Sequence, residues 1–264
     1  MINFYKYHGV GNDFIMINNL DKSIFLTPED ISLYCDRNFG IGADGVILLE
    51  SSDKADCFMN YYNSDGSIAQ MCGNGARCTA KFYLKETGKD VKEINLETRA
   101  GVKNIKVNDD DTYSIDMGAP IFESPDFPAG ELKLEDFDFN CVSMGNPHAV
   151  TLVDDLEKID LKTVGPKIEK NENFPNKINV EFVEKVSDDY FKVKVWERGC
   201  GVTLACGTGA CAVFSILNLK QGRSLLKKEI ILEFPGGKLY LSKNEQDHVI
   251  LRGPATFVFE GKII

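Results

Sequence analysis

The sequence predicts an α+β protein with two pseudo-symmetric domains. In each, a curved and mostly antiparallel sheet wraps around a central helix, and the active site lies in the cleft between the domains. Three observations favour this class: strand-like runs outnumber helical ones, two long helical patterns are about half a chain apart, and one motif recurs at that same distance. The 264 residues amount to about 1.8 domains of roughly 150 residues each, which allows two small domains.

Short apolar or alternating runs between turn residues predict the strands. We expect strands at residues 45–49, 58–62, 102–107, 113–117, 177–183, 191–196, 229–234 and 249–252. Apolar residues at helical spacing predict one helix over 74–85, ending at Gly88, and another over 208–219, ending near Gly222. Three prolines within 120–128 predict a linker. The expected domains are residues 1–118 with 253–264, and residues 119–252.

A Cys-Gly-x-Gly motif occurs twice, and its two cysteines, Cys72 and Cys206, are 206 − 72 = 134 residues apart. The same offset relates Asn12 to Asn146 and Asn63 to Glu197, with similar neighbours in each case. Three matches in one register indicate two homologous halves. A cleft between such halves is a common place for a small-molecule site.

Composition excludes several classes of function. The net charge is −10, which argues against a nucleic-acid or anionic-membrane partner, since both require a basic surface. No apolar run approaches the roughly 20 residues of a spanning helix, so we expect a soluble cytoplasmic protein with reduced thiols. None of the eight cysteines forms a C-x-x-C pair, which disfavours zinc-ribbon and thioredoxin-like sites. We expect neither a metal nor a cofactor.

Each Cys-Gly-x-Gly motif stands where a helix is expected to begin. A helix start offers unpaired N–H groups that can hold an anion, and it favours the thiolate form of a cysteine. Two such thiols on opposite sides of one carbon could exchange its proton, one as base and the other as acid. The alternative is that both turns are helix caps with inert cysteines, although capping does not require cysteine.

The motifs resemble those of the diaminopimelate epimerase family, over nearly the whole chain. The residues that carry the resemblance are 9–14, 63–67, 71–78, 145–148, 197–199 and 204–209. The family belongs to a wider group of cofactor-independent amino-acid racemases and epimerases. Membership implies interconversion of LL- and meso-diaminopimelate without pyridoxal phosphate or metal, on the route to lysine and peptidoglycan, and it implies a homodimer.

The resemblance also assigns roles to individual residues. It implies that Cys72 and Cys206 are the acid/base thiols and that His148 and Glu197 tune their acidity, with a purely structural histidine as the alternative for His148. The backbone groups that would hold the reacting carboxylate are those of Gly73, Asn74, Gly207 and Thr208. The residues implied to bind the amino groups and the distal carboxylate of a diamino dicarboxylate substrate are Asn12, Asn63, Asn146, Asn179, Glu197 and Arg198.

The chain departs from the family pattern at a few positions. Some members carry Gln in place of Gly45, many carry Glu in place of Val202, and many have a smaller residue at Cys200, which we expect to be a small buried filler. These departures leave open a related substrate such as lanthionine. A non-catalytic diamino-acid binding protein is the alternative outside enzymes, and a cysteine hydrolase is the alternative among them, but a hydrolase does not explain two matched cysteines.

Two further patterns are interpreted as structural. Residues 40–45 match G-x-G-x-x-G, but a dinucleotide fingerprint follows a strand and opens a helix, whereas here a helix is expected before the motif and a strand after it. Residues 108–111 are acidic but lack the ligand spacing of a calcium loop, so we expect the tip of a hairpin there.

Overall fold

The computed structural model describes residues 1–220 and 229–264, and the chain splits into two compact units. Unit 1 comprises Met1–Ile115 and Gly253–Ile264, and unit 2 comprises Asp116–Arg252. The expected helix end near Gly222 lies outside the described residues. Within the described ranges, no helix is long and apolar enough to cross a membrane.

Unit 1 contains one twisted sheet. Its strands, in the order in which they pair, are β17 (Thr256–Ile263), β1 (Ile2–Gly9), β2 (Asn12–Asn19), β3 (Gly45–Glu50), β4 (Cys57–Asn63), β5 (Glu93–Thr98), β6 (Gly101–Val107) and β7 (Thr112–Asp116). The pairs β2–β3 and β4–β5 are parallel and the others antiparallel. Parallel neighbours need a crossover, which α1 (Pro28–Cys35) and α2 (Gly73–Thr87) provide.

Unit 2 repeats this arrangement. Its strands pair in the order β8 (Glu131–Leu134), β9 (Phe137–Ser143), β10 (Pro147–Val153), β11 (Asn179–Lys185), β12 (Tyr190–Glu197), β14 (Ile230–Phe234), β15 (Gly237–Lys243) and β16 (Val249–Pro254). The short β13 (Gly201–Thr203) pairs with β12. The parallel pairs are β10–β11 and β12–β14. The crossover between β10 and β11 contains η1 (Leu156–Lys158) and α3 (Leu161–Glu169), and the crossover between β12 and β14 contains α4 (Gly207–Lys220).

The strand register reproduces the repeat seen in the sequence. Val46 pairs with Tyr62 in unit 1, and Val180 pairs with Trp196 in unit 2, which is an offset of 134 on both strands. The parallel pairing of Phe14 with Gly45 recurs as that of His148 with Asn179. Because a one-residue slip would turn every side chain to the other face of the sheet, this agreement means that corresponding residues lie on corresponding faces. The predicted α+β class and its pseudo-symmetry are confirmed.

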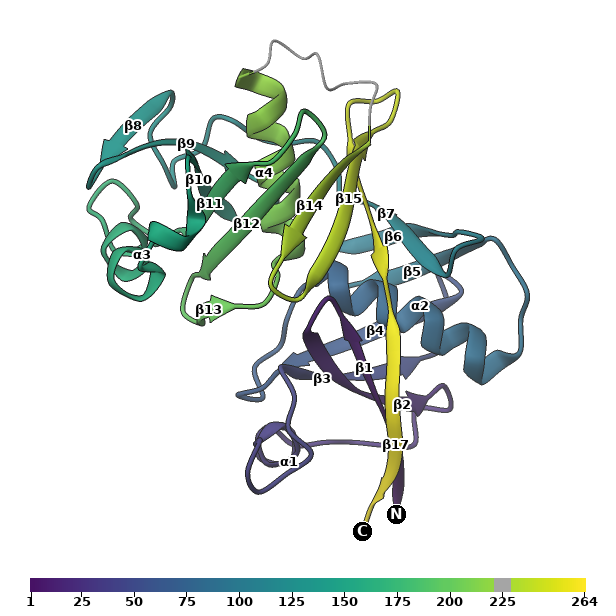
Figure 1. Cartoon of the computed structure of the whole chain (residues 1–264). Helices are drawn as coiled ribbons and strands as arrows, with labels where there is room; N and C mark the ends of the chain where they lie inside the picture. The colour runs from purple at the N-terminus through teal and green to yellow at the C-terminus, as the bar shows by residue number, and fades with distance from the viewer. Residues whose placement is uncertain (221–228) are drawn as a thin grey trace. The chain divides into compact units, whose positions relative to one another are not determined.

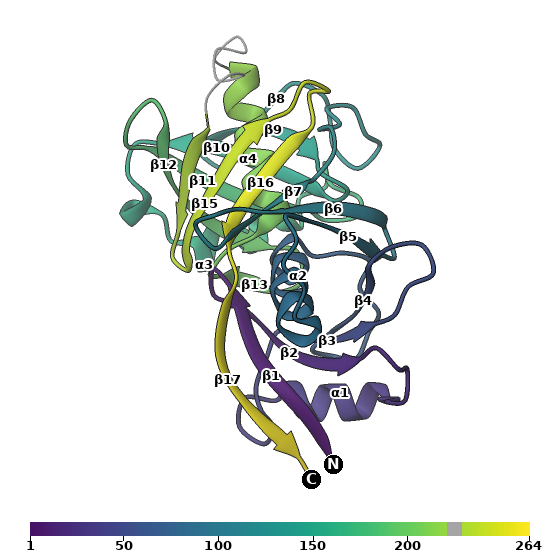
Figure 2. The same cartoon turned by 90° about the vertical axis from the view of Figure 1, so that its right-hand side faces the viewer.

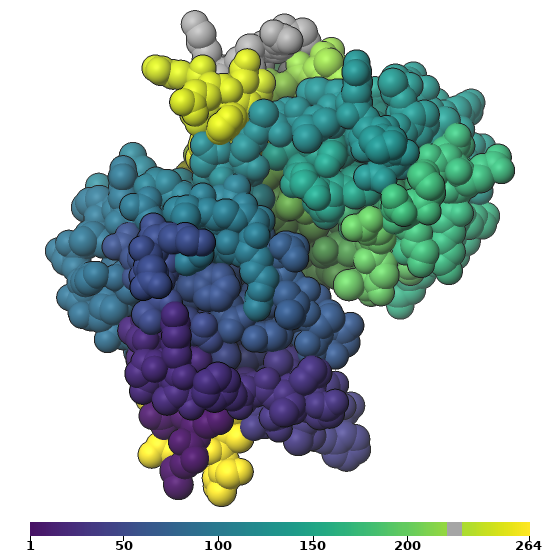
Figure 3. Space-filling view, turned by 180° about the vertical axis from the view of Figure 1, so that it is seen from behind, coloured from purple at the N-terminus to yellow at the C-terminus, as the bar shows by residue number. Residues whose placement is uncertain are grey.

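Each unit wraps its sheet around one helix, as Figures 1 and 2 show for α2 and α4. Helix α4 is buried almost continuously from Gly207 to Asn218, as expected of a helix surrounded by core. Helix α2 ends at Gly88, whose φ of 65° allows its N–H to bond to the carbonyl of Leu84, as the sequence predicted. The N-terminal and C-terminal strands pair with each other in unit 1, where Figure 3 shows purple beside yellow.

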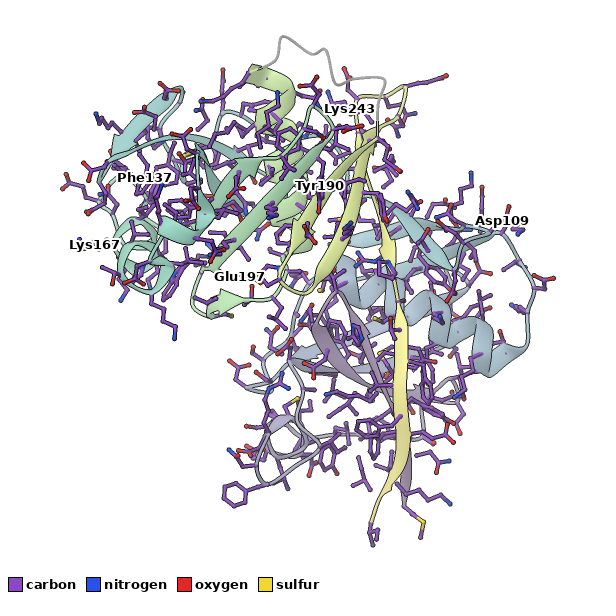
Figure 4. All side chains as sticks on the ribbon, viewed as in Figure 1. Asp109, Phe137, Lys167, Tyr190, Glu197 and Lys243 are labelled. Carbon is purple, nitrogen blue, oxygen red and sulfur yellow. The ribbon has the colours of Figure 1, made fainter. Side chains whose placement is uncertain are left out.

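Four other segments of the chain were assigned from the sequence. Residues 40–45 do connect a helix to a strand, and Asp109 lies in the turn between β6 and β7 (Figure 4). The interpretation of residues 120–128 as a linker is wrong, because Phe127 is buried in the core of unit 2. Cys200 is exposed rather than buried, since it lies in the tight turn between β12 and β13.

We expect Gly45→Ala to destabilise the fold by about 1–3 kcal/mol through overpacking. A Cβ at this position would lie 2.4 Å from the backbone oxygen of Tyr62 and 2.6 Å from the ring of Tyr61. Gly75→Ala is the matched control, because its Cβ would first meet the flexible end of Ile47, at 3.1 Å. Urea unfolding checks the prediction, and equal midpoints for the two variants would contradict it.

Candidate active site

Cys72 occupies the N-cap of α2. Its backbone is extended, with φ −142° and ψ 123°, and its carbonyl accepts the first helical bond, from Ala76 N at 2.8 Å. The N–H groups of the first helical turn have no partners within the helix. The expected placement of the first Cys-Gly-x-Gly motif at a helix start is confirmed.

Asn12 connects Cys72 to a group of polar side chains. Its Oδ1 accepts from the Cys72 thiol at 3.4 Å and from Asn74 Nδ2 at 3.2 Å, and its Nδ2 donates to Asp44 at 2.7 Å. Asn74 in turn accepts at 2.7 Å from Arg77, which is fully buried. No sequence motif assigns a role to Asp44 or Arg77, and it is their hydrogen bonds to Asn12 and Asn74 that place them in this group.

Asn63 belongs to a different group of hydrogen bonds. At the end of β4, its side chain donates to Ser67 Oγ at 2.9 Å, and its backbone N–H donates to the carbonyl of Ser67. Its register position opposite Gly45 corresponds to that of Glu197 in unit 2. The role of Asn63 in substrate binding stays a prediction.

Cys206 directly precedes α4, and its sulfur caps the helix. Gly209 N donates to Sγ at 3.4 Å, Thr208 Oγ1 lies 3.5 Å from it, and the carbonyl of Cys206 accepts from Ala210 N at 2.9 Å. The side chain is buried. Burial is the largest cause that raises the pKa of this thiol well above 9, and the nearby carboxylates of Glu197 and Glu181 raise the pKa further. The direction of this shift favours the neutral thiol over the thiolate that a helix start alone would favour.

Glu197 ends β12, where Figure 4 shows it next to β13. Thr203 Oγ1 donates to its Oε1 at 2.5 Å. Burial raises the pKa of Glu197, while hydrogen bonds from Thr203 and from the Cys206 thiol act in the opposite direction. The structure thus brings two residues selected from sequence, Glu197 and Cys206, into contact.

His148 lies wholly inside unit 2. Its Nδ1 is 2.7 Å from Glu181 Oε1, and its Nε2 is 3.1 Å from Asn146 Oδ1. His148 and Glu181 are both 0 % exposed. Glu181 was not predicted from the sequence. The 134-residue offset aligns it with Ile47, and a glutamate that replaces an apolar residue of the repeat is the signal that could have identified it.

Asn179 and Arg198 form a neighbouring pair. Asn179 Oδ1 accepts from the backbone N–H of Arg198 at 2.9 Å, and its Nδ2 donates to the carbonyl of Pro147 at 2.9 Å. The Arg198 guanidinium donates to the carbonyl of Asn176 at 3.0 Å and is exposed. The described residues contain no cluster of His, Cys, Asp and Glu that could hold a metal ion.

We expect iodoacetamide at pH 8 to alkylate Cys72 well before Cys206. Cys72 is partly exposed, whereas Cys206 is buried and held as the unreactive thiol. The experiment uses the Cys200→Ser protein to remove the exposed third site. Peptide mapping against time measures each rate, and raising the pH should speed the reaction of Cys206. Equal rates at the two sites at pH 8 would contradict the prediction.

Comparison with known families gives a full-length match. The model of the family described as diaminopimelate epimerase matches residues 4–123 and 140–258. The chain is 43 % identical to the diaminopimelate epimerase of Methanococcus maripaludis strain C5, over 98 % of this chain and 99 % of that protein. It is also 43 % identical to the enzyme of Carboxydothermus hydrogenoformans, over 98 % of each chain, and 41 % identical to the chloroplastic one of Oryza sativa subsp. japonica, over 100 % of this chain and 80 % of that protein.

Solved structures with low sequence identity share the fold. A PhzF-family phenazine biosynthesis protein from Bacillus anthracis aligns with a TM-score of 0.70 at 19 % identity, covering 100 % of this chain and 99 % of that one. A hydroxyproline epimerase from Agrobacterium vitis, with bound trans-4-hydroxy-L-proline, aligns with a TM-score of 0.69 at 13 % identity, covering 98 % and 91 %. The architecture is therefore shared by proteins of differing sequence.

Proposed function

The chain belongs to the diaminopimelate epimerase family, and from this premise we propose that it interconverts LL- and meso-2,6-diaminopimelate, for lysine and peptidoglycan precursor synthesis. The observation that carries the proposal is the duplicated Cys-Gly-x-Gly helix start, with one thiol in each unit. We expect the enzyme to act in the cytoplasm as a homodimer, without a cofactor.

The reaction is a proton exchange at one α-carbon. The Cys72 thiolate removes the α-proton, and the electron pair of the C–H bond moves into the adjacent carboxylate to form an enediolate. The Cys206 thiol then donates its proton to the opposite face, so that Cys72 ends as the thiol and Cys206 as the thiolate. The raised pKa of Cys206 supports its role as donor in the resting enzyme. The reverse reaction exchanges the two roles.

The helix starts stabilise the charge that develops on the carboxylate. In this proposal its oxygens accept from backbone N–H groups at the beginning of α2 and α4, where the helix dipole also favours negative charge. The residues assigned to this task are Gly73, Asn74, Gly207 and Thr208. Such donors act most strongly on the enediolate, because it concentrates more charge on the oxygens than the ground state does.

The remaining residues recognise the rest of the substrate. A guanidinium such as that of Arg198 can bind both oxygens of the distal carboxylate, and the Glu197 carboxylate suits an ammonium group. The amides assigned to the amino groups and the distal end are those of Asn12, Asn63, Asn146 and Asn179. A substrate with two amino-acid ends fits this mixture of anionic, cationic and amide groups.

Incubation in D₂O tests the proposal. LL-diaminopimelate should gain deuterium at one α-carbon as it becomes the meso isomer, because the donated proton comes from a thiol equilibrated with solvent. Mass spectrometry of product from the first turnovers measures this, and lanthionine assayed alongside tests substrate choice. Binding without epimerisation would favour the non-catalytic alternative, and product that retains all its original hydrogen would exclude the two-thiol route.

A further inference from the structure

We propose that Glu169 is a positioning residue that holds the turn after β12 and so directs Arg198 to the distal carboxylate of the substrate, an inference that rests on the proposed epimerase function. Glu169 is the last residue of α3 and is 3 % exposed. Arg198 lies in the turn between β12 and β13, and α3 lies beside both strands (Figure 1). Glu169 has no place in the recognition of substrate described above.

Both carboxyl oxygens of Glu169 accept hydrogen bonds from this part of the chain. Oε1 accepts from the backbone N–H of Gly199 at 3.1 Å, and Oε2 accepts from the indole N–H of Trp196 at 2.8 Å. The indole ring also packs closely on α3, because a Cβ at Gly165 would lie 2.6 Å from it. One buried side chain therefore holds the main chain on both sides of Arg198.

Arg198 is held by two further contacts. Its backbone N–H donates to Asn179 Oδ1 at 2.9 Å, and its guanidinium donates to the carbonyl of Asn176 at 3.0 Å. Two successive N–H groups of the turn, those of Arg198 and Gly199, are thus each bonded to a side chain from another element. Fixing the backbone under a long exposed side chain reduces the ordering that binding must otherwise impose on it.

The same turn occurs in unit 1. Gly66 N donates to the carbonyl of Asn63 at 3.0 Å, and Cys200 N donates to the carbonyl of Glu197 at 3.0 Å. The two donors are 134 residues apart, and so are the two acceptors. The turns therefore correspond residue by residue, and each closes through its own backbone.

Unit 2 adds side-chain acceptors to this shared turn. The residues of unit 1 that correspond to Asn179 and Glu169 at the offset of 134 are Gly45 and Cys35. Gly45 has no side chain, and the buried thiol of Cys35 is only a weak acceptor. Glutamate is rarely buried, because removing its carboxyl group from water is costly. Since unit 1 builds the same turn without a carboxyl group, we assign the one in unit 2 to the positioning of Arg198.

The kinetic test compares the wild-type protein with Glu169→Gln. Glutamine keeps the size of the side chain but offers one acceptor oxygen to two N–H donors. KM for diaminopimelate should rise roughly tenfold, with kcat within about twofold of the wild type, because the guanidinium binds the distal end equally in the ground state and the transition state. Glu172→Gln is the matched control, since Glu172 is exposed and lies three residues further along the chain. Its KM should stay as in the wild type.

A double-mutant cycle separates positioning from a general loss of stability. The Arg198→Ala protein lacks the guanidinium, so adding Glu169→Gln to it should change KM by less than about twofold. A rise in KM as large as in the wild-type background, or a fall in kcat in place of the rise in KM, would overturn the inference. A wild-type protein that neither binds nor converts diaminopimelate would instead overturn the proposed function.

Amide hydrogen exchange tests the geometry without substrate. In the wild-type protein, the N–H groups of Arg198 and Gly199 should exchange more slowly than those of residues 64–65, which occupy the corresponding positions in unit 1. In Glu169→Gln, Gly199 should exchange faster, and the ¹⁵N-indole signal of Trp196, the single tryptophan of the chain, should shift. Should that variant fail to fold, the wild-type comparison decides, because equal exchange in the two turns would overturn the inference.

Discussion

Replacing Cys72 or Cys206 by serine is expected to lower kcat for diaminopimelate epimerisation by about 10²- to 10⁴-fold, the usual contribution of a positioned acid or base. Serine keeps a hydroxyl of similar size at the helix start, but it ionises far less readily than a thiol. Substrate affinity should change little, because the carboxylate is assigned to backbone N–H groups. Steady-state kinetics in both directions, with calorimetric binding of substrate, measure the two effects.

The matched control for these variants is Cys200→Ser. Cys200 is exposed and lies six residues before Cys206 in the chain, so it tests the loss of a nearby thiol without touching either helix start. It should keep wild-type activity. A cysteine hydrolase would lose its activity in only one of the two variants Cys72→Ser and Cys206→Ser. Full activity in either Cys72→Ser or Cys206→Ser would therefore refute the two-thiol mechanism.

Unfolding of the protein at alkaline pH is the second large effect that we expect. Burial raises the pKa of Cys35, Cys57, Cys78 and Cys141 from 9 to about 12 in the folded state. Between these values the unfolded chain loses the protons while the folded chain keeps them, so stability falls as the pH rises. Each thiol costs about 1.4 kcal/mol per pH unit in this range. Four thiols together can offset a typical stability of about 5–15 kcal/mol within two to three units above pH 9.

Urea unfolding between pH 7 and 11 measures this loss. The contribution of these four thiols to the free energy of unfolding should be nearly constant up to about pH 8.5. Above that pH the free energy of unfolding should fall steeply. Cys57→Ala removes one of the four groups, so its curve should start lower because of the cavity but decline less steeply, by about 1.4 kcal/mol per pH unit. Parallel slopes for this variant and the wild type would show that the buried thiols do not control the alkaline limit.

Local patterns in the sequence predicted the central elements well. Helix α2 follows from apolar spacing and its stop at Gly88, and the repeat predicted that unit 2 would copy it. Helix α3 was missed because Gly165 and Pro166 interrupt its pattern. Tertiary packing explains why a glycine stands inside this helix, since a Cβ at Gly165 would lie 2.6 Å from the ring of Trp196. Phe127, within a proline-rich segment, was likewise assigned to a linker because sequence alone does not reveal which core a side chain joins.

The sequence by itself determined the duplication, the helix starts at Cys72 and Cys206, and the family, because these depend on residue type and on spacing along the chain. The tertiary structure alone decided how the two thiols differ. Glu181 and His148 are 33 residues apart in the chain and meet only because β10 and β11 pair in parallel. Burial strengthens the hydrogen bond between these two side chains. Burial also raises the pKa of Cys206. Long-range strand pairing and exclusion of water are properties of the folded chain, so they leave no local signal in the order of its residues.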